Sequence, residues 1–235
     1  MAEIANSSII CSRLHQIFHN LRRYSFPFDE DNLPENGIYV LFEKGEHAHN
    51  GLDRIVRVGT HTGWNNLGKR LAEHFLTENK DRSIFRKNIG RALLNRQKDP
   101  FLKQWEMDLT AKESREQHAA RIDSSRLSEI EIEVSRIIRT AFTFCVFRVD
   151  RRPQRLELEA RMIATINHCT GCHPSKHWLG SHSPRSQIRE SGLWLVQHLN
   201  GPVMTIGDLE NLEKRIHLAS NSIALLAFPA TGLVL

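Results

Sequence analysis

Two short apolar segments in the first quarter of the chain constrain its fold more than any other feature. They read GIYVLF, residues 37–42, and RIVRVG, residues 54–59, and both are rich in β-branched or aromatic residues. The residues between them, EKGEHAHNGLD, are polar and contain glycine, which predicts a hairpin with a long loop. AFTFCVFRV, residues 141–149, has the same character, so the sequence predicts a third strand there.

Segments with helical periodicity surround these strands. Apolar residues recur at helical spacing over residues 10–21, until the proline-containing FPFDEDNLPENG breaks the pattern. NNLGKRLAEHFLTE carries an apolar residue at every fourth position behind an asparagine N-cap. A long polar region at about 80–140 is predicted to be helical, and RLELEARMIATIN predicts a helix at 155–167.

Composition limits the class of protein. The chain has 235 residues, 40% of them hydrophobic and 25% charged, which suffices for one sizeable core or one core with an appended lobe. No run approaches the roughly 18 apolar residues of a membrane span, and Arg13 and His15 interrupt the N-terminal apolar stretch. Four cysteines are too few and too uneven for a disulfide framework. We expect a cytoplasmic protein with no membrane partner.

Positive charge is concentrated in two places. The net charge is only +5, but basic residues gather between 80 and 98 and again between 148 and 155. Such clusters can neutralise phosphates, which indicates a polyanionic partner; a solvated helix face is the alternative. In SIFRKNIGRALL, residues 83–94, the apolar positions are expected to face the body. The basic ones, Arg86, Lys87 and Arg91, are expected to face a nucleic acid backbone.

One carboxylate stands out by its helical position. Glu159 shares a stripe with Met162, Ile163 and Ile166, so it projects from an apolar face, where a charge is costly unless a cation meets it. Its neighbour Glu157 instead lies four residues before Arg161, as in an ordinary surface pair. Glu159 is therefore the candidate functional carboxylate, and a buried ion pair with an arginine is the alternative.

Together these segments resemble the GIY-YIG nuclease family. The likeness rests on Gly37-Ile38-Tyr39, on RVG at 57–59, on NLGKRLAEHF opening the next helix, and on LEARMI around Glu159. It covers 36–75 and 142 to about 178. The resemblance implies an α+β fold with a small three-stranded antiparallel sheet flanked by helices, with a helical insertion and a C-terminal helical extension. We accordingly divide the chain into an N-terminal helix (1–30), a nuclease domain (31–180, insertion at about 80–140) and an extension (181–235).

The resemblance also implies roles for individual residues. Tyr39 would be the general base or water-orienting group, although a phenol titrates near about pH 10 and would need cations around it. Arg70 would stabilise charge on the scissile phosphate, and His74, one turn later, would bond the tyrosine or the attacking water. Glu159 would hold one divalent ion, Mg²⁺ or Mn²⁺. A core tyrosine, a surface arginine and a satisfied core histidine are the structural alternatives.

The chain departs from the family pattern at three points. Arg57 replaces the second motif tyrosine, the loop between the two motifs is longer than usual, and His177 in PSKHWLG stands where the family has asparagine. Arg57 and His177 could still contact phosphate, as could Lys69 beside Arg70. The departures make a slow, altered or inactive site an open alternative.

A different motif, HCTGCH at 168–173, contains Cys-x-x-Cys-His. Covalent haem would require export, for which the chain shows no signal, so no haem is expected. A separate zinc site from Cys169, Cys172 and one or two of His168, His173 and His177 suits the softness and spacing of these ligands. Free thiols in a turn are the alternative.

The sequence thus predicts a metal-dependent endonuclease, acting on DNA rather than RNA. The alternatives are a nucleic-acid-binding module that kept the fold without catalysis, and a zinc-binding structural protein whose motif matches are accidental. The apolar end ALLAFPATGLVL is predicted to pack on the C-terminal lobe or to form a homodimer contact.

Overall fold

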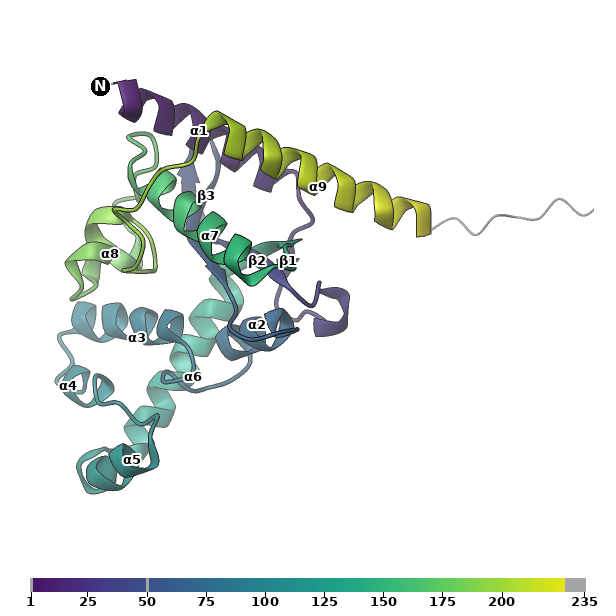
Figure 1. Ribbon diagram of the computed structural model, residues 1–235. Coiled ribbons are helices and arrows are strands. Elements are labelled where there is room, and N and C mark those ends of the chain that lie inside the picture. Colours follow the sequence, from purple (N-terminus) through teal and green to yellow (C-terminus); the bar gives the residue numbers. More distant parts are fainter. Residues whose placement is uncertain (1, 50, 227–235) are drawn as a thin grey trace, which may run out of the picture.

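The computed structural model describes residues 2–49 and 51–226, which form an antiparallel sheet covered by helices on both faces (Figure 1). The strands are β1 (Tyr24–Ser25), β2 (Gly37–Ala48), β3 (Leu52–Thr60) and β4 (Phe142–Arg148). Their order in the sheet is β1-β4-β2-β3. The predicted α+β fold is confirmed, with the difference that the two-residue β1 adds a fourth strand, which is too short for its sequence to reveal.

The helices of the described residues lie on both faces of this sheet. In chain order they are α1 (Ala2–His19), α2 (Leu67–Phe75), α3 (Ile84–Gln97), α4 (Leu102–Trp105), α5 (Lys112–His118), α6 (Ser124–Ala141), α7 (Arg152–Asn167), α8 (Ser186–Ser191) and α9 (Ile206–Leu226). Single 3₁₀ turns occur at Glu30–Asn32, Ala119–Arg121 and Leu179–His182. None of the helices in the described part of the chain is long and apolar enough to cross a membrane.

The β2–β3 hairpin is longer than the sequence predicted. Pairing continues to Ala48↔Leu52, so the expected long loop shrinks to a tight turn in which His49 and Gly51 have positive φ. The polarity of EKGEHAHNGLD misled the prediction because Glu46 and Arg54 are both buried. Their side chains form an ion pair at 2.7 Å across the two strands.

Alternation along β2 builds a separate core on each face of the sheet. Ile38, Val40 and Phe42 face a core shared with α1, α7 and the first turns of α9. Tyr39 and Leu41 face a second core shared with α2, α3 and α6. Figure 1 shows α1 and α9 running side by side over the first face, with α3 and α6 on the opposite side.

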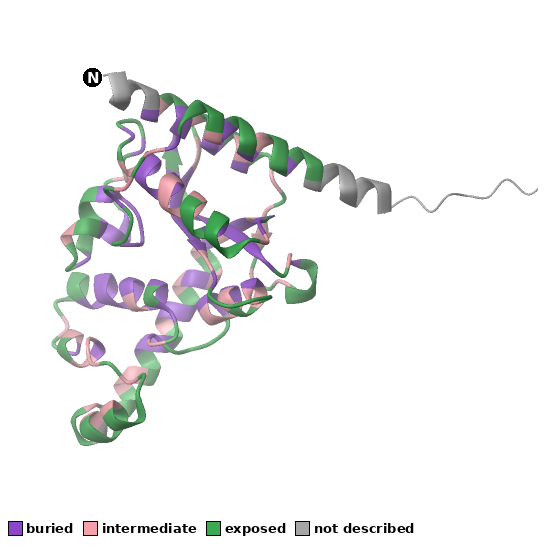
Figure 2. Ribbon diagram, viewed as in Figure 1, coloured by how far each residue is buried: buried purple, intermediate pink, exposed green. Residues whose placement is uncertain are grey.

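The inserted region is helical, as expected from its sequence. Serine and aspartate N-caps begin two of its helices: Ser83 accepts the Arg86 amide in α3, and Asp123 accepts the Arg126 amide in α6. Most of α3 is buried (Figure 2), and a Cβ at Gly90 would lie 2.3 Å from the Trp105 ring, so α4 packs directly on its backbone. The α5 turn is largely exposed.

The C-terminal helix begins with a capping box. The Thr205 hydroxyl accepts the Asp208 amide at 3.1 Å, and the Asp208 carboxylate accepts the Thr205 amide at 2.8 Å. Thr205 is therefore the N-cap of this helix. Residues 227–235, which hold most of the predicted apolar packing or dimer segment, lie outside the described residues.

Candidate active site

Tyr39 occupies the centre of the strand face turned toward α2 and α3. It pairs with Gly59 on β3, and its ring lies across that glycine so closely that a Cβ there would be 2.2 Å from the hydroxyl. The glycine of RVG is thus required because the tyrosine covers it. The Tyr39 side chain is buried, with 1% exposure.

A series of hydrogen bonds leads from the phenol into the core. The Tyr39 hydroxyl lies 2.7 Å from His74 Nε2, and His74 Nδ1 lies 2.7 Å from the Ser83 hydroxyl, the N-cap of α3. His74 is fully buried. Burial first, then the nearby Arg70, Arg57 and Arg86, hold the pKa of His74 well below its usual range, so the ring is neutral and one of its nitrogens can accept a hydrogen bond.

Two guanidinium groups meet the same phenol. Arg57 Nε donates to the Tyr39 hydroxyl at 3.5 Å, and Arg70 lies near enough for its charge to interact with Tyr39. A phenol oxygen has two acceptor sites and one proton. Because a guanidinium can only donate, the phenolic proton points to His74 Nε2, and His74 Nδ1–H donates to Ser83. Tyr39 and His74 therefore form a directed proton path.

Arg70 reaches this cluster from α2 while remaining partly open to solvent. Its side chain is 23% exposed, pairs with Glu73 at 2.8 Å, and donates to the Arg82 carbonyl at 2.9 Å. Burial alone lowers the Arg70 pKa, but Tyr39 and Glu73 more than offset this, and the pKa is raised. The Arg70 guanidinium therefore stays positively charged, and it lies at the partly exposed edge of the site.

Arg57, which replaces the second motif tyrosine, is held more deeply. It is 6% exposed, donates to the Trp194 carbonyl and lies 5.5 Å from the Phe85 ring centroid. The Trp194 amide in turn donates to Val56 at 2.8 Å, so the segment after α8 covers the free edge of β3. Arg57 therefore contacts both Tyr39 and this segment. Contact between Arg57 and a substrate phosphate stays a prediction.

Glu159 projects from α7 toward the end of β3. Its Oε1 accepts the Thr60 amide at 3.1 Å, and the apolar stripe beside it is buried, as its spacing predicted. Burial raises the pKa of the Glu159 carboxyl, and Arg57, His198, the Thr60 amide and Arg70 oppose that rise. Glu157 forms the predicted surface pair with Arg161 at 3.1 Å.

The surroundings of Glu159 suit a divalent cation. No ion pair joins it to an arginine among the residues described here, and its Oε2 accepts no hydrogen bond from them. A single carboxylate with water and substrate phosphate is a common donor set for Mg²⁺. Glu159 could therefore hold such an ion, with waters and phosphate completing its coordination.

Two histidines near the site escaped the sequence analysis. The charge of His198 acts on Glu159, and the residue adopts φ 62° in the segment that covers β3. His61 Nε2 accepts the Gly37 amide at 3.3 Å, and its buried Nδ1 has no hydrogen-bond partner within the described part of the chain. No local pattern distinguishes either residue in the sequence. His177, the predicted asparagine counterpart, is exposed beside Trp178, whose indole donates to Glu43, four residues beyond Tyr39 on β2.

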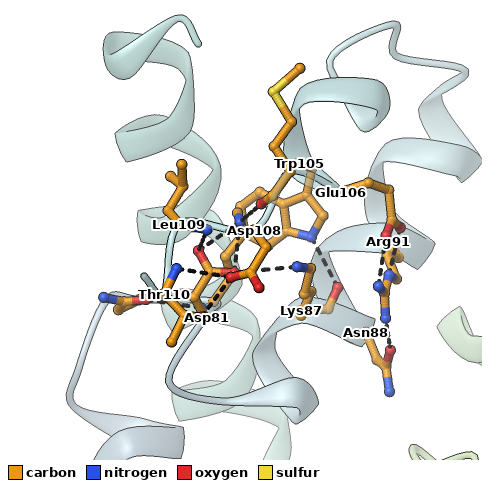
Figure 3. A network of polar contacts seen from close by, with 12 residues as sticks. Asp81, Lys87, Asn88, Arg91, Trp105, Glu106, Asp108, Leu109 and Thr110 are labelled. Carbon is orange, nitrogen blue, oxygen red and sulfur yellow. Dashed lines mark hydrogen bonds and ion pairs between the residues drawn. The ribbon is translucent and has the colours of Figure 1, made fainter. Parts of the chain in front are cut away.

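The basic residues of α3 require a correction. Arg86 is fully buried and bonds Glu131 at 2.7 Å, Ser135 at 2.8 Å and the His74 carbonyl at 3.3 Å. Lys87 pairs with Asp81 at 3.2 Å, and Arg91 forms a bidentate pair with Glu106 at 2.6 and 2.7 Å (Figure 3). All three charges are paired with carboxylates of the helical insert, and Arg86 and Arg91 are buried, so they do not form the outward-facing basic row that the sequence predicted. Lys69 is exposed on α2, and its phosphate contact stays a prediction.

Removing Arg86 should destabilise the protein strongly. Arg86→Ala leaves Glu131 buried without its partner, which costs about 3–5 kcal/mol for a pair of this kind. Urea unfolding monitored by circular dichroism measures the loss. Arg82→Ala, on the exposed side chain just before α3, is the matched control and should change stability by less than about 0.5 kcal/mol. Equal stability of both variants would contradict the buried-pair assignment.

The predicted zinc ligands are only partly brought together. Cys172 lies 3.5 Å from Cys11 of α1, and Cys169 lies 3.4 Å from His49 in the hairpin turn. His173 is exposed, and His168 Nδ1 bonds the Ala164 carbonyl at 2.8 Å, as in an ordinary helix end. The sequence missed Cys11 and His49 because they are distant along the chain.

Comparison with known proteins gives one match. The family model described as GIY-YIG domain matches residues 6–227, nearly the whole chain. The match includes most of α1, the inserted helices and all of α9. Searches of curated proteins and of solved structures found no match.

Proposed function

The chain belongs to the GIY-YIG family, which implies a nuclease-type function, and from this premise we propose that it is a metal-dependent endonuclease hydrolysing phosphodiester bonds of DNA. The observation that carries the proposal is the Tyr39–His74 pair, joined at 2.7 Å, with Arg57 and Arg70 on the phenol. A core tyrosine needs one partner for its hydroxyl. Two cations and a neutral histidine around one phenol exceed what a core tyrosine needs, and this arrangement suits proton transfer.

In the proposed reaction, water attacks phosphorus in line with the leaving oxygen. The water passes a proton to the Tyr39 oxygen as the phenolic proton moves to His74 Nε2. Because the surroundings of His74 disfavour its charged form, that proton returns to Tyr39, and one proton passes on through water to the leaving oxygen, which restores both side chains. The Arg57 contact at 3.5 Å is long, and the water can take its place. Arg70 offsets the negative charge that develops on the phosphate. Glu159 would hold a divalent ion, which would supply Lewis-acid polarisation of the phosphate and charge stabilisation at the leaving oxygen.

Access to Tyr39 requires movement of the covering segment. The phenol is buried, and Arg57 is anchored to the Trp194 carbonyl in the segment that bonds the edge of β3. We expect this segment to shift when nucleic acid binds, because its anchoring bonds to β3 are few. His198 lies on the same segment, so its charge would move relative to Glu159 in that step.

Trp64 is the side chain best suited to contact the bases. It is 66% exposed in the loop directly after β3, and the loop is fixed by Arg155 bonding the Gly63 carbonyl at 3.3 Å and by Asn36 bonding Asn65 at 2.7 Å. Stacking on an exposed aromatic ring contributes about 1–3 kcal/mol per base. Trp64→Ala should therefore weaken DNA binding about 5- to 150-fold, as measured by fluorescence anisotropy.

The control for this prediction is Ile132→Ala. Ile132 is also a large exposed apolar residue, at 55% exposure, but lies on α6. It should leave DNA affinity unchanged. Equal affinity of the Trp64 and Ile132 variants would remove Trp64 from the proposed interface.

The function itself is tested on a panel of substrates. Wild-type protein is incubated with supercoiled plasmid, linear duplex, single-stranded DNA and RNA, in Mg²⁺, in Mn²⁺ and in chelator followed by excess Mg²⁺. We expect nicked or linear DNA only where Mg²⁺ or Mn²⁺ is present. Cleavage of RNA alone would overturn the substrate assignment, and cleavage that chelator leaves unchanged would overturn the metal dependence.

A non-catalytic DNA-binding module is the second candidate, and one observation favours it. Arg57 cannot supply the phenol of the second motif, and its bond to Trp194 holds the covering segment over a buried Tyr39. This reading predicts DNA retardation in a gel with no cleavage of any substrate in the panel.

A further inference from the structure

A second cluster of reactive side chains lies on the opposite face of the sheet from Tyr39. Cys11 comes from α1, His49 from the β2–β3 turn, and Cys169 and Cys172 from the segment after α7. The three cysteines belong to the core shared by α1, α7 and α9, whereas Tyr39 belongs to the other core. The proposed hydrolytic mechanism uses none of these four residues.

The ligand atoms of this cluster have the spacing of a tetrahedral metal site. Cys11 Sγ lies 3.5 Å from Cys172 Sγ, and Cys169 Sγ lies 3.4 Å from His49 Nε2. The ligand atoms of Cys11, His15, His49 and Cys172 all lie within 4.8 Å of one another. Four ligands around Zn²⁺, at about 2.3 Å for sulfur and 2.0 Å for nitrogen, would be about 3.5–3.8 Å apart.

His15 is next to the cluster but is already fully bonded. Its Nδ1 lies 2.8 Å from the Cys11 carbonyl, and its Nε2 accepts the Ile55 amide at 3.1 Å. The same Nε2 lies 3.5 Å from Cys172 Sγ, but the Ile55 amide already occupies its lone pair. His15 therefore fixes the position of Cys11 through its contact with the Cys11 carbonyl and is not itself a ligand. Cys169 supplies the third sulfur ligand.

The backbone around the cluster places His49 against the turn that contains Cys169 and Cys172. His49 adopts φ 35°, which a side-chain-bearing residue rarely does. A Cβ at Gly171 would lie 2.9 Å from the His49 ring, so the Cys-x-x-Cys turn needs its glycine to admit the imidazole. The Gly171 amide donates to Cys169 Sγ at 3.3 Å, and Thr170 bonds Ser8 of α1 at 3.2 Å.

From this geometry we infer that Cys11, Cys169, Cys172 and His49 hold one structural Zn²⁺ ion. Four protein ligands close the coordination sphere, which distinguishes such a site from the open position that a catalytic zinc needs. The ion would connect α1 and the hairpin turn to the end of α7, the helix that carries Glu159. This assignment replaces the sequence-based set, because His168, His173 and His177 take no part.

The test begins with the metal content of the full-length protein purified without chelator. Elemental analysis should give about one zinc per chain in the wild type and in Glu159→Gln, since the site is independent of the proposed nuclease centre. Cys172→Ser and His49→Ala should lose most of the zinc. The matched controls Cys145→Ser, at a buried thiol elsewhere, and His173→Ala, at the exposed neighbour, should keep it.

Cobalt substitution identifies the ligands even if a variant folds poorly, because it is measured on the wild type. Three thiolates predict strong sulfur-to-cobalt charge transfer, and His15→Gln should preserve the spectrum. Loss of cobalt binding in His15→Gln alone would assign the fourth position to His15 and overturn the Cys169 assignment. A zinc-free wild type that stays folded in zinc-replete medium, or a disulfide between Cys11 and Cys172, would overturn the site altogether.

Discussion

Tyr39→Phe is expected to lower the cleavage rate about 100- to 10,000-fold, the range found for loss of a group that transfers a proton in the transition state. The phenyl ring can still lie across Gly59 and fill the same core, so folding should be retained. DNA affinity should also be retained, since the buried hydroxyl contacts His74 and the two arginines. Single-turnover cleavage with saturating protein measures the chemical step directly.

The chain offers an exact control for this substitution. It contains two tyrosines, and the other, Tyr24, donates to the Asn32 carbonyl at 3.3 Å outside the site. Tyr24→Phe should cleave at the wild-type rate. If Tyr39→Phe did the same, the proton path through His74 would be wrong, and Tyr39 would be a core tyrosine.

Glu159→Gln should have an effect of at least similar size on the same assay. The amide keeps the shape of the side chain and can still accept the Thr60 amide, but it removes the charge that would hold a divalent ion. Loss of the stabilisation that a metal gives to the transition state costs several kcal/mol, or roughly 100- to 1,000-fold or more in rate. Circular dichroism should show an unchanged fold.

The same substitution should not lower stability. Burial raises the pKa of the Glu159 carboxyl, which means that the folded environment disfavours its charge. Replacing the carboxylate by a neutral amide therefore removes the free-energy cost of burying a negative charge. A loss of activity together with retained or increased resistance to urea would identify Glu159 as a functional residue. Loss of both would point instead to a structural ion pair.

Local sequence patterns identified the parts of the site that depend on one element at a time. The alternation of GIYVLF predicted the strand that carries Tyr39, and the spacing to Met162, Ile163 and Ile166 placed Glu159 on a buried stripe. The bond from Thr60 to Glu159 and the approach of His198 join distant segments. No periodicity within a segment encodes such contacts.

The basic cluster shows why charge alone misled the prediction. Arg86, Lys87 and Arg91 look like a solvent-facing row because their partners lie elsewhere in the sequence: Glu131 on α6, Glu106 after α4, and Asp81 before α3. A run of positive residues predicts phosphate binding only if those charges have no internal partners. The sequence-based choice of zinc ligands was incomplete for a related reason. Cys11 and His49 are remote in sequence from the Cys-x-x-Cys motif.

The most direct test of the central claim compares wild type, Glu159→Gln and Glu157→Gln on supercoiled plasmid over a titration of Mg²⁺ and Mn²⁺. The two variants remove the same charge from the same helix, but Glu157 is exposed and pairs with Arg161. We expect metal-dependent nicking by wild type and Glu157→Gln, and none by Glu159→Gln at any metal concentration. Equal nicking by all three proteins would contradict the role of Glu159 as the metal ligand.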